Sequence, residues 1–255
     1  MKILLGSQSP RRRELLAGLD VDFRVVAIDA DEHYPDGLTG GDIPYYISRS
    51  KAEAYGVPLA EDEVLLTADT IVWVPWEGES MGAARGAQCF EFPAPCPLPA
   101  KFTPLRGACG GPERGAGEFA RVPGDSMIAG EDACALGGVM LGKPRDAEEA
   151  RGMLRLLSGR MHEVYTGVTL RTREGMQTIA DKTEVWFRAL SEEEISYYVK
   201  KYKPLDKAGA YGVQEWIGYV GVTKIVGSYF NVMGLPVERV WEILSDLQNR
   251  GLCYR

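Results

Sequence analysis

The sequence predicts an α/β fold, and three observations lead to that prediction. Apolar, β-rich segments alternate along the chain with segments whose apolar residues recur at helical spacing. The 255 residues are 45% hydrophobic and 25% charged, an ordinary globular composition with enough chain for a substantial core. No apolar run approaches the ~20 residues that a membrane span needs, so no membrane association is expected.

The first part of the chain is expected to form three strands and two helices. Residues 2–5 (KILL) and 24–28 (RVVAI) are short apolar runs typical of strands, and residues 64–74 form a much longer one. One helix begins after Ser9, and a second is expected over residues 42–56, where Gly56 suits the position after a helix end.

Residues 75–138 interrupt this pattern. They are rich in Gly, Ala and Pro, contain four of the five cysteines and show no sustained period. A structureless run of this length is unusual inside a compact domain, so we expect a poorly ordered insertion within a single domain that spans residues 1–255. The cysteine spacings match no zinc site, and free thiols without a role are expected.

Regular structure is expected to resume at residue 139. Asp146 with Glu149 resembles a capping box at the start of a helix that Gly159 ends. The remaining expected elements are strands at 163–172 and 178–189, a helix that opens with Ser191 and Glu194, a strand at 219–226 and a helix at 236–247.

Charge excludes one class of partner. The formal net charge is -7 and the isoelectric point about 5.1, which argues against a general nucleic-acid-binding protein. The first residues lack the pattern of a signal peptide, so a cytoplasmic location is expected. His33 and His162 lie far apart in the sequence and suggest no histidine-based metal site.

The stretch GSQSPRRREL places three arginines at the start of a helix. Ser9 and Pro10 read as the N-cap and the first helical position, so Arg11 and Arg12 lie where the helix dipole is already positive. Exposed N–H groups and cations there suit an anion, although a solvated basic patch is an equal alternative. If an anion explains them, Arg12→Ala weakens its binding and leaves the melting temperature unchanged or slightly raised.

Other charged residues stand in unusual local contexts. Asp69 interrupts an apolar strand, where a carboxylate is costly unless it is paired or binds a metal, although a structural role at the backbone is an alternative. Glu32 lies in an acidic loop, Lys51 on an amphipathic helix and Lys143 between a strand and a helix, and each taken alone also fits a plain surface role. Gln214 ends a segment of small residues that permits close approach to a ligand.

Together these residues suit a polyphosphate with a divalent cation. Lys and Arg bind anionic oxygens, and carboxylates such as Asp69 and Glu32 favour Mg²⁺ or Mn²⁺. The common phosphate-binding loops G-x-x-x-x-G-K-[ST] and G-x-G-x-x-G do not occur in this sequence. The residues alone therefore lead to a phosphorylated ligand with a metal.

Six motifs in order resemble those of the Maf family of nucleoside triphosphate pyrophosphatases, over about residues 1–74 and 139–247. They are GSQSPRRRELL, SKAEAY, LLTADTIV, LGKPRDAEEARGMLRLLSG, DKAGAYGVQ and GSYFNVMGLP. The last two are similar to the subgroup that acts on dTTP and UTP. The resemblance implies a two-lobed α/β fold with a long central mixed sheet and a deep cleft. It also implies hydrolysis of the nucleotide to the monophosphate and pyrophosphate.

The resemblance also implies roles for nine residues. Asp69 resembles the proton acceptor, and the positions of Arg11, Thr70 and Gln214 are linked to substrate choice. The residues that match phosphate-binding positions are Ser7, Arg12, Lys51 and Lys143, while Glu32 matches an acidic position. Asp69 and Glu32 are the candidate metal ligands.

Two alternatives to a dTTP/UTP pyrophosphatase are kept. One is a pyrophosphatase with another base preference, such as 7-methyl-GTP or modified nucleotides, against which the surroundings of Gln214 argue. The other is a non-enzymatic regulator of cell division at the septum. Asp69, Lys51 and Lys143 together favour an enzyme, because a binding module needs no base. A homodimer is left open.

Overall fold

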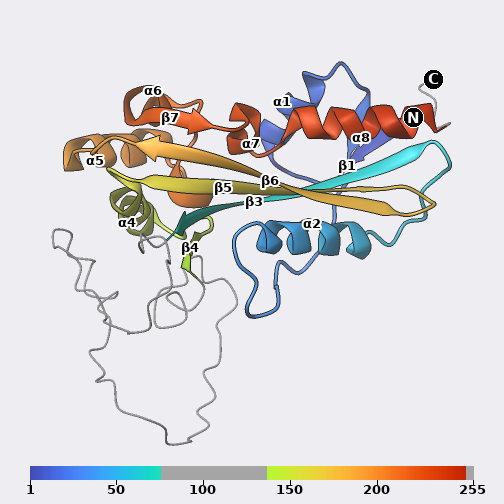
Figure 1. The fold of residues 1–255 in the computed structure, drawn as a ribbon, viewed down its shortest axis with the longest axis horizontal. Helices are drawn as coiled ribbons and strands as arrows, with labels where there is room; N and C mark the ends of the chain where they lie inside the picture. Colours follow the sequence, from blue (N-terminus) through green and yellow to red (C-terminus); the bar gives the residue numbers. More distant parts are fainter. Residues whose placement is uncertain (76–136, 251–255) are drawn as a thin grey trace, which may run out of the picture.

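One long mixed sheet organises the fold, which the computed structural model describes over residues 1–75 and 137–250 (Figure 1). Its strands are β1 Lys2–Leu5, β2 Phe23–Val25, β3 Glu63–Pro75, β4 Gly138–Leu141, β5 Met161–Arg171, β6 Met176–Phe187 and β7 Val222–Val226. The strand order is β2-β1-β3-β5-β6-β7, and β4 pairs with β3 beside this path. The α/β class with a long central mixed sheet is therefore confirmed.

The pairing of β3 leaves a gap along one of its edges. On that edge β1 runs parallel to residues 63–66, and β4 runs antiparallel to residues 72–75. The opposite edge pairs antiparallel with β5 over residues 65–73. Among the described residues, 67–71 therefore have no strand beside them on the first edge, which leaves room for a ligand there.

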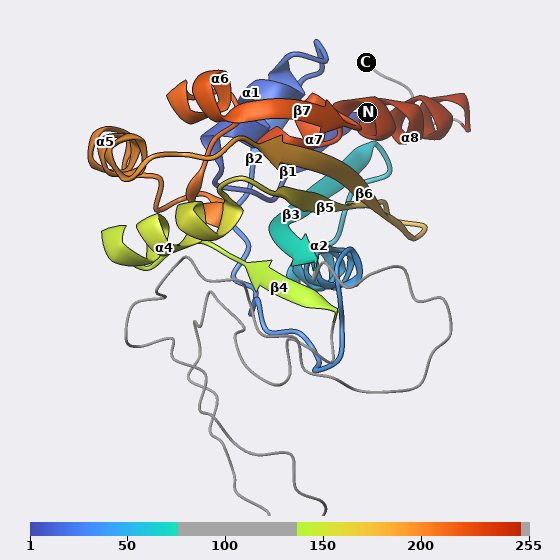
Figure 2. The ribbon, with the colours of Figure 1, turned by 60° about the vertical axis from the view of Figure 1, so that its left-hand side comes forward.

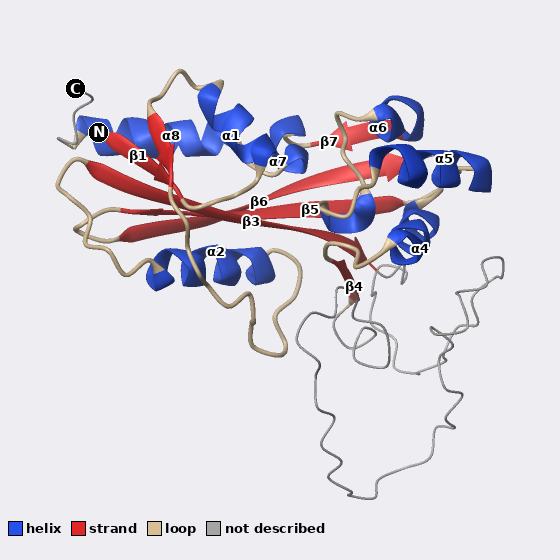
Figure 3. Cartoon of the chain, turned by 180° about the vertical axis from the view of Figure 1, so that it is seen from behind, coloured by secondary structure: helices blue, strands red, loops and turns tan. Residues whose placement is uncertain are grey.

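Helices cover both faces of the sheet. They are α1 Pro10–Ala17, α2 Asp42–Ala54, α4 Ala147–Leu157, α5 Glu192–Tyr202, α6 Trp216–Gly221, α7 Tyr229–Met233 and α8 Val237–Asn249, with a short 3-10 turn, η2, at Ala208–Ala210. One face carries α2, and the other carries α1, α7 and α8 (Figure 1, Figure 3). The remaining helices α4, α5 and α6 gather at the end of the long strands that lies away from α2 and α8 (Figure 2).

Two hydrophobic clusters lie at the two ends of the sheet. The first joins β1, α1 and α8, with Leu16 and Leu244 fully buried in it. The second joins α4, α5 and the far ends of β5 and β6, with Leu154 and Tyr198 fully buried. The strands β3 and β5 contribute side chains to both clusters, so they hold two lobes at fixed positions.

Gly167 allows α2 to lie close against the sheet. It pairs with Asp69 in the register between β5 and β3. A Cβ atom at Gly167 would lie 2.0 Å from the carbonyl oxygen of Pro44, in the first turn of α2. Only glycine permits this approach of helix and strand, which brings the α2 residue Lys51 within reach of Asp69.

Most expected elements agree with the structure, and two boundaries need correction. The strand expected at 24–28 is β2 at 23–25, because its partner β1 ends at Leu5, which pairs with Val25. The strand expected at 219–226 begins only at Val222, because residues 216–221 form α6. The capping box of Ser191 with Glu194 is present, and Asp146 accepts the hydrogen bond from Glu149 N–H.

The predicted insertion at 75–138 falls almost entirely outside the described residues, which resume at 137. Its two ends are described, and Pro75 pairs directly with Gly138 in the antiparallel ladder of β3 and β4. The segment between them therefore leaves and re-enters the sheet at neighbouring positions.

Replacing residues 76–137 with a two-residue turn is expected to preserve the fold. Adjacent antiparallel strands are commonly joined by such turns, so β3 and β4 keep their register. We expect the shortened chain to melt cooperatively within about 5 °C of the full chain, a change of only ~1–2 kcal/mol. Loss of the cooperative transition would show that the segment contributes to the core.

No helix in residues 1–75 or 137–250 has the length and hydropathy of a membrane span.

Candidate functional site

A cleft of about 420 Å³ opens at the gap in β3, between the two lobes. Its walls come from the turn before α1, the loop before α2, α2 itself, β3, the segment after β4 and the segment around η2. All nine residues singled out from the sequence line this cleft: Ser7, Arg11, Arg12, Glu32, Lys51, Asp69, Thr70, Lys143 and Gln214.

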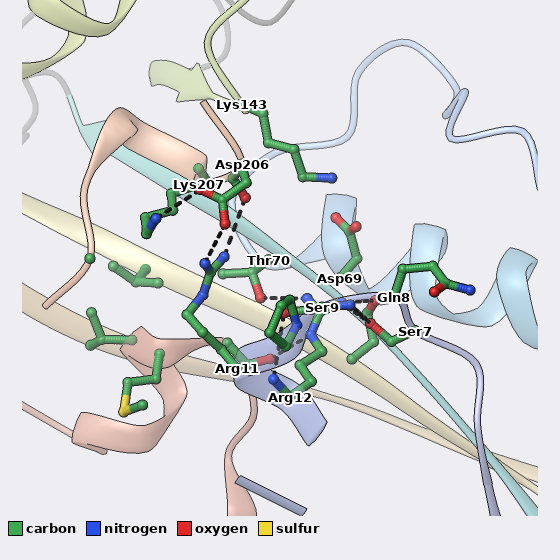
Figure 4. A pocket seen from close by; sticks show the side chains of 18 of the residues that line it. Ser7, Gln8, Ser9, Arg11, Arg12, Asp69, Thr70, Lys143, Asp206 and Lys207 are labelled. Atoms are coloured by element: carbon green, nitrogen blue, oxygen red, sulfur yellow. Dashed lines mark hydrogen bonds and ion pairs between the residues drawn. The ribbon is translucent and has the colours of Figure 1, made fainter. Parts of the chain in front are cut away.

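The first turn of α1 brings Arg12 to the floor of the cleft. Ser9 caps the helix as expected, accepting a hydrogen bond from Arg12 N–H. The Arg12 guanidinium donates from Nε to Gly234 O (2.8 Å) and from Nη1 to Ala68 O (2.8 Å). Its Nη2 donates to Thr70 Oγ1 (2.9 Å) (Figure 4). Arg12 therefore joins α1, β3 and the turn after α7.

These bonds change the expectation for Arg12. Repulsion by the helix dipole predicts no loss of stability on truncation only for a side chain that makes no structural contacts. The structure instead shows a partly buried guanidinium with three hydrogen bonds to two other segments, β3 and the turn after α7. Burial lowers the pKa of Arg12 below its ordinary value, although Asp69 opposes that shift.

Lys51 joins the two carboxylates of the cleft. Its Nζ lies 2.8 Å from Asp69 Oδ1 and 2.8 Å from Glu32 Oε1. The side chains of Lys51 and Asp69 are each 13% exposed, whereas Glu32 lies at the open side. Burial raises the pKa of Glu32, but Lys51, Lys143 and Arg12 outweigh burial and hold it below its usual value. The single cation of Lys51 therefore holds both carboxylates in place.

Lys143 follows β4 and points into the cleft (Figure 4). It is exposed, and it makes no hydrogen bond or ion pair with the other residues that the structure describes. Its ammonium is therefore available to an anionic ligand, unlike that of Lys51.

Two charged residues that line the cleft, Asp206 and Lys207, were not predicted from the sequence. Asp206 Oδ2 lies 2.6 Å from Arg11 Nη1, and Asp206 Oδ1 lies 2.7 Å from Lys207 Nζ. Lys207 Nζ also lies 3.0 Å from Glu215 Oε1. A signal for them is present in the sequence, because an acidic and a basic residue open the segment DKAGAYGVQ directly before its small residues.

The remaining wall of the cleft is largely apolar. It contains Tyr211, Val72 and Val232, which belong to one hydrophobic cluster. Gln214 lies beside them, and its Oε1 is buried with no hydrogen-bond partner among the described residues. Buried amide oxygens are normally satisfied, so this atom is suited to accept a hydrogen bond from a ligand.

The carboxylates of the cleft do not form a complete metal site by themselves. In the described part of the chain, no three His, Cys, Asp or Glu side chains gather closely enough to hold an ion. Asp69 and Glu32 provide two carboxylates, and one oxygen of each contacts Lys51. Mg²⁺ is usually bound by one or two carboxylates with substrate phosphates and water, so this donor set fits an ion that enters with a nucleotide.

The sequence of this chain is similar to those of known proteins. A family model described as Maf-like protein matches residues 2–88 and 113–247. The 24 positions from 89 to 112 that lie between these matches fall within the predicted insertion and are fewer than the 75–138 expected from composition.

Proteins named dTTP/UTP pyrophosphatase are similar to this chain over nearly their whole length. One from Parabacteroides distasonis is 42% identical over 245 residues, covering 96% of this chain and 95% of the relative. Another from Bacteroides thetaiotaomicron is 41% identical over 247 residues, covering 96% of each. A solved nucleoside-triphosphatase / dITP/XTP pyrophosphatase from Mycobacterium abscessus aligns over 97% of both chains at 14% identity, with a TM-score of only 0.35.

Proposed function

The chain belongs to the Maf family, and on this premise we propose that it hydrolyses dTTP and UTP to the nucleoside monophosphate and pyrophosphate. The observation that carries the proposal is the cleft at the gap in β3. There a carboxylate held by a lysine, Asp69 with Lys51, lies in the same cavity as Lys143, a cation with no ion-pair partner among the residues that the structure describes. The two base names come from the relatives described above.

Asp69 is proposed to activate the attacking water. The oxygen of water bonds to the α-phosphorus, and the bond from that phosphorus to the oxygen bridging to the β-phosphorus breaks. Asp69 accepts the proton of the water, and pyrophosphate carries away the electron pair of the broken bond. Lys51 orients the Asp69 carboxylate through their 2.8 Å contact, so the base has one position.

The cations of the cleft are proposed to hold the phosphates. Lys143 has no competing partner among the described residues, so its ammonium binds phosphate oxygens directly. Ser7 lies in the turn before α1 and offers a hydroxyl and nearby backbone N–H groups. Three N–H groups of Arg12 donate hydrogen bonds to other parts of the protein, so its main contribution to phosphate binding is a fixed positive charge.

A divalent cation, Mg²⁺ or Mn²⁺, is proposed as the cofactor, with Asp69 and Glu32 as its protein ligands. When bound, such an ion neutralises charge that develops on the phosphate oxygens. Both carboxylates contact Lys51, so we expect the ion to bind weakly unless a nucleotide supplies further oxygens.

The experiment that tests this function is an assay of pyrophosphate release across a panel of nucleotides. The panel includes dTTP, UTP, dGTP and 7-methyl-GTP, each with Mg²⁺, with Mn²⁺ and with EDTA. We expect turnover of dTTP and UTP that EDTA abolishes. Preference for 7-methyl-GTP would replace the substrate assignment. No turnover of any nucleotide would favour the non-enzymatic regulator of cell division.

Two further proposals concern the location of the protein in the cell and its oligomeric state. A cytoplasmic location fits nucleoside triphosphate substrates, and cell fractionation tests it. A homodimer is left open, and analytical ultracentrifugation of the full chain decides between one copy and two.

A further inference from the structure

Asp206 fixes the guanidinium of Arg11 across the cleft. Arg11 Nη1 donates to Asp206 Oδ2 at 2.6 Å, and Arg11 Nη2 donates to the backbone oxygen of Asp206 at 3.2 Å. Two bonds from one planar group to one residue define the orientation of that plane. These bonds use two of the five N–H groups of Arg11, so three stay available to a ligand.

Asp206 is itself anchored to the core, although its side chain is 56% exposed. Lys207 Nζ bonds to Asp206 Oδ1 and to Glu215 Oε1, and the Lys207 side chain is only 9% exposed. Glu215 accepts a short hydrogen bond from the hydroxyl of Tyr198, a fully buried residue of α5. An unbroken series of contacts therefore runs from the core to Arg11.

Charge differs between the two ends of the cleft. We define one end by the lining residues Arg11, Asp206 and Lys207, where Asp206 pairs with both cations and Lys207 also pairs with Glu215, which is not itself a lining residue. The other end is defined by the lining cations Arg12, Lys51 and Lys143, beside which the described lining residues provide two carboxylates, Asp69 and Glu32. The surplus positive charge of the second end suits phosphates, whereas the balanced first end suits an uncharged group.

The balanced end also borders the apolar wall. The segment that carries Asp206 continues into Ala208 and Tyr211, which line the cleft and pack in the same hydrophobic cluster as Val72. An apolar wall beside a fixed, charge-balanced donor matches the faces and edges of a nucleobase. It does not match a polyanion.

We propose that Asp206 is a positioning residue that holds Arg11 as a hydrogen-bond donor to the uncharged part of the nucleotide and so sets nucleotide preference. The inference rests on the proposed function. Asp206 acts through Arg11 and does not contact the reacting atoms. Loss of its carboxylate would free Arg11 to swing towards phosphate and would leave Lys207 with one partner fewer.

Two ligands separate this role from a role in phosphate binding. Inorganic tripolyphosphate probes only the phosphate end, and α,β-methylene-dTTP probes both ends without being hydrolysed. Calorimetry on the full chain compares the parent with Asp206→Ala. We expect binding of the dTTP analogue to weaken roughly ten-fold, the typical effect of losing a charge-assisted hydrogen bond. We expect tripolyphosphate binding to stay within about two-fold.

Kinetics and a double-mutant cycle provide further readouts. For Asp206→Ala we expect KM for dTTP to rise while kcat changes less, and the preference for dTTP over dGTP to fall. The double variant Arg11→Ala with Asp206→Ala should be no worse than Arg11→Ala alone, because both changes remove one interaction. Asp206→Glu, which keeps the carboxylate, should restore part of the preference. Asp206→Asn has the parent's shape and replaces Asp206→Ala if the latter does not fold.

A matched control removes a carboxylate from an ion pair outside the cleft. Asp62 pairs with Lys2 at 3.0 Å, so Asp62→Ala should leave all binding constants unchanged. Equal weakening of both ligands by Asp206→Ala, additive effects in the cycle, or no effect at all would each overturn the inference. A parent protein that binds neither ligand would instead overturn the proposed function, and this inference with it.

Discussion

Asp69→Asn is expected to lower kcat for dTTP by about 100-fold or more, the usual loss when a general base is removed. Asparagine has the same shape, and its amide oxygen can still accept the hydrogen bond from Lys51. The fold is therefore expected to survive, with KM changed much less than kcat. Steady-state release of pyrophosphate, with a thermal melt of the same samples, checks both statements.

The control for this variant is Asp181→Asn. Asp181 also lies within a strand, β6, but it does not line the cleft. It should therefore keep the parent rate. If Asp69→Asn also hydrolyses dTTP at the parent rate, Asp69 has only a structural role as the partner of Lys51.

Arg12→Ala is expected to lower both activity and stability. The substitution leaves the carbonyl oxygens of Gly234 and Ala68 without their donor, and hydrogen bonds from charged groups contribute more than neutral ones. We expect a loss of about 2–4 kcal/mol in the free energy of unfolding. At ~2–4 °C per kcal/mol for a chain of this size, the melting temperature falls by roughly 5–15 °C.

Arg13→Ala provides the comparison within the same helical turn. Arg13 is exposed, and the described residues provide it with no ion pair or hydrogen bond. Its removal should leave the melting temperature unchanged or slightly raised, because it relieves repulsion by the helix dipole. Lys143→Ala should weaken nucleotide binding without lowering stability. An unchanged melting temperature for Arg12→Ala would restore the original expectation that Arg12 serves the ligand alone.

Much of the fold could be predicted because local signals agreed with tertiary structure. Pro10 after Ser9, and Ser191 with Glu194, mark helix starts through bonds within a few residues of the chain. The strand expected at 219–226 begins later in the structure than predicted. The apolar and aromatic residues at the start of this range are compatible both with a strand that pairs with β6 and with the helix α6. Short apolar runs cannot be assigned by periodicity alone.

The members of the site could be predicted, but their partners could not. Asp69 stood out because a carboxylate in an apolar strand needs a reason. Nothing local indicated that Asp206 would bond to Arg11, since 195 positions separate them in the sequence. The contact between Lys51 and Asp69 depends on the glycine at 167, which permits α2 to approach β5. Such contacts follow from packing between distant segments, which no local pattern encodes.

The bond from Arg12 to Gly234 has a consequence for how the protein is made. The two residues are 222 positions apart, so the floor of the cleft cannot close until Gly234 has left the ribosome. The cluster around β1 and α1 likewise cannot be completed before Leu235 and Leu244 have been synthesised. Domains dominated by such distant contacts fold slowly. A polypeptide released before Gly234 is made would therefore lack the bond that closes the floor of the cleft.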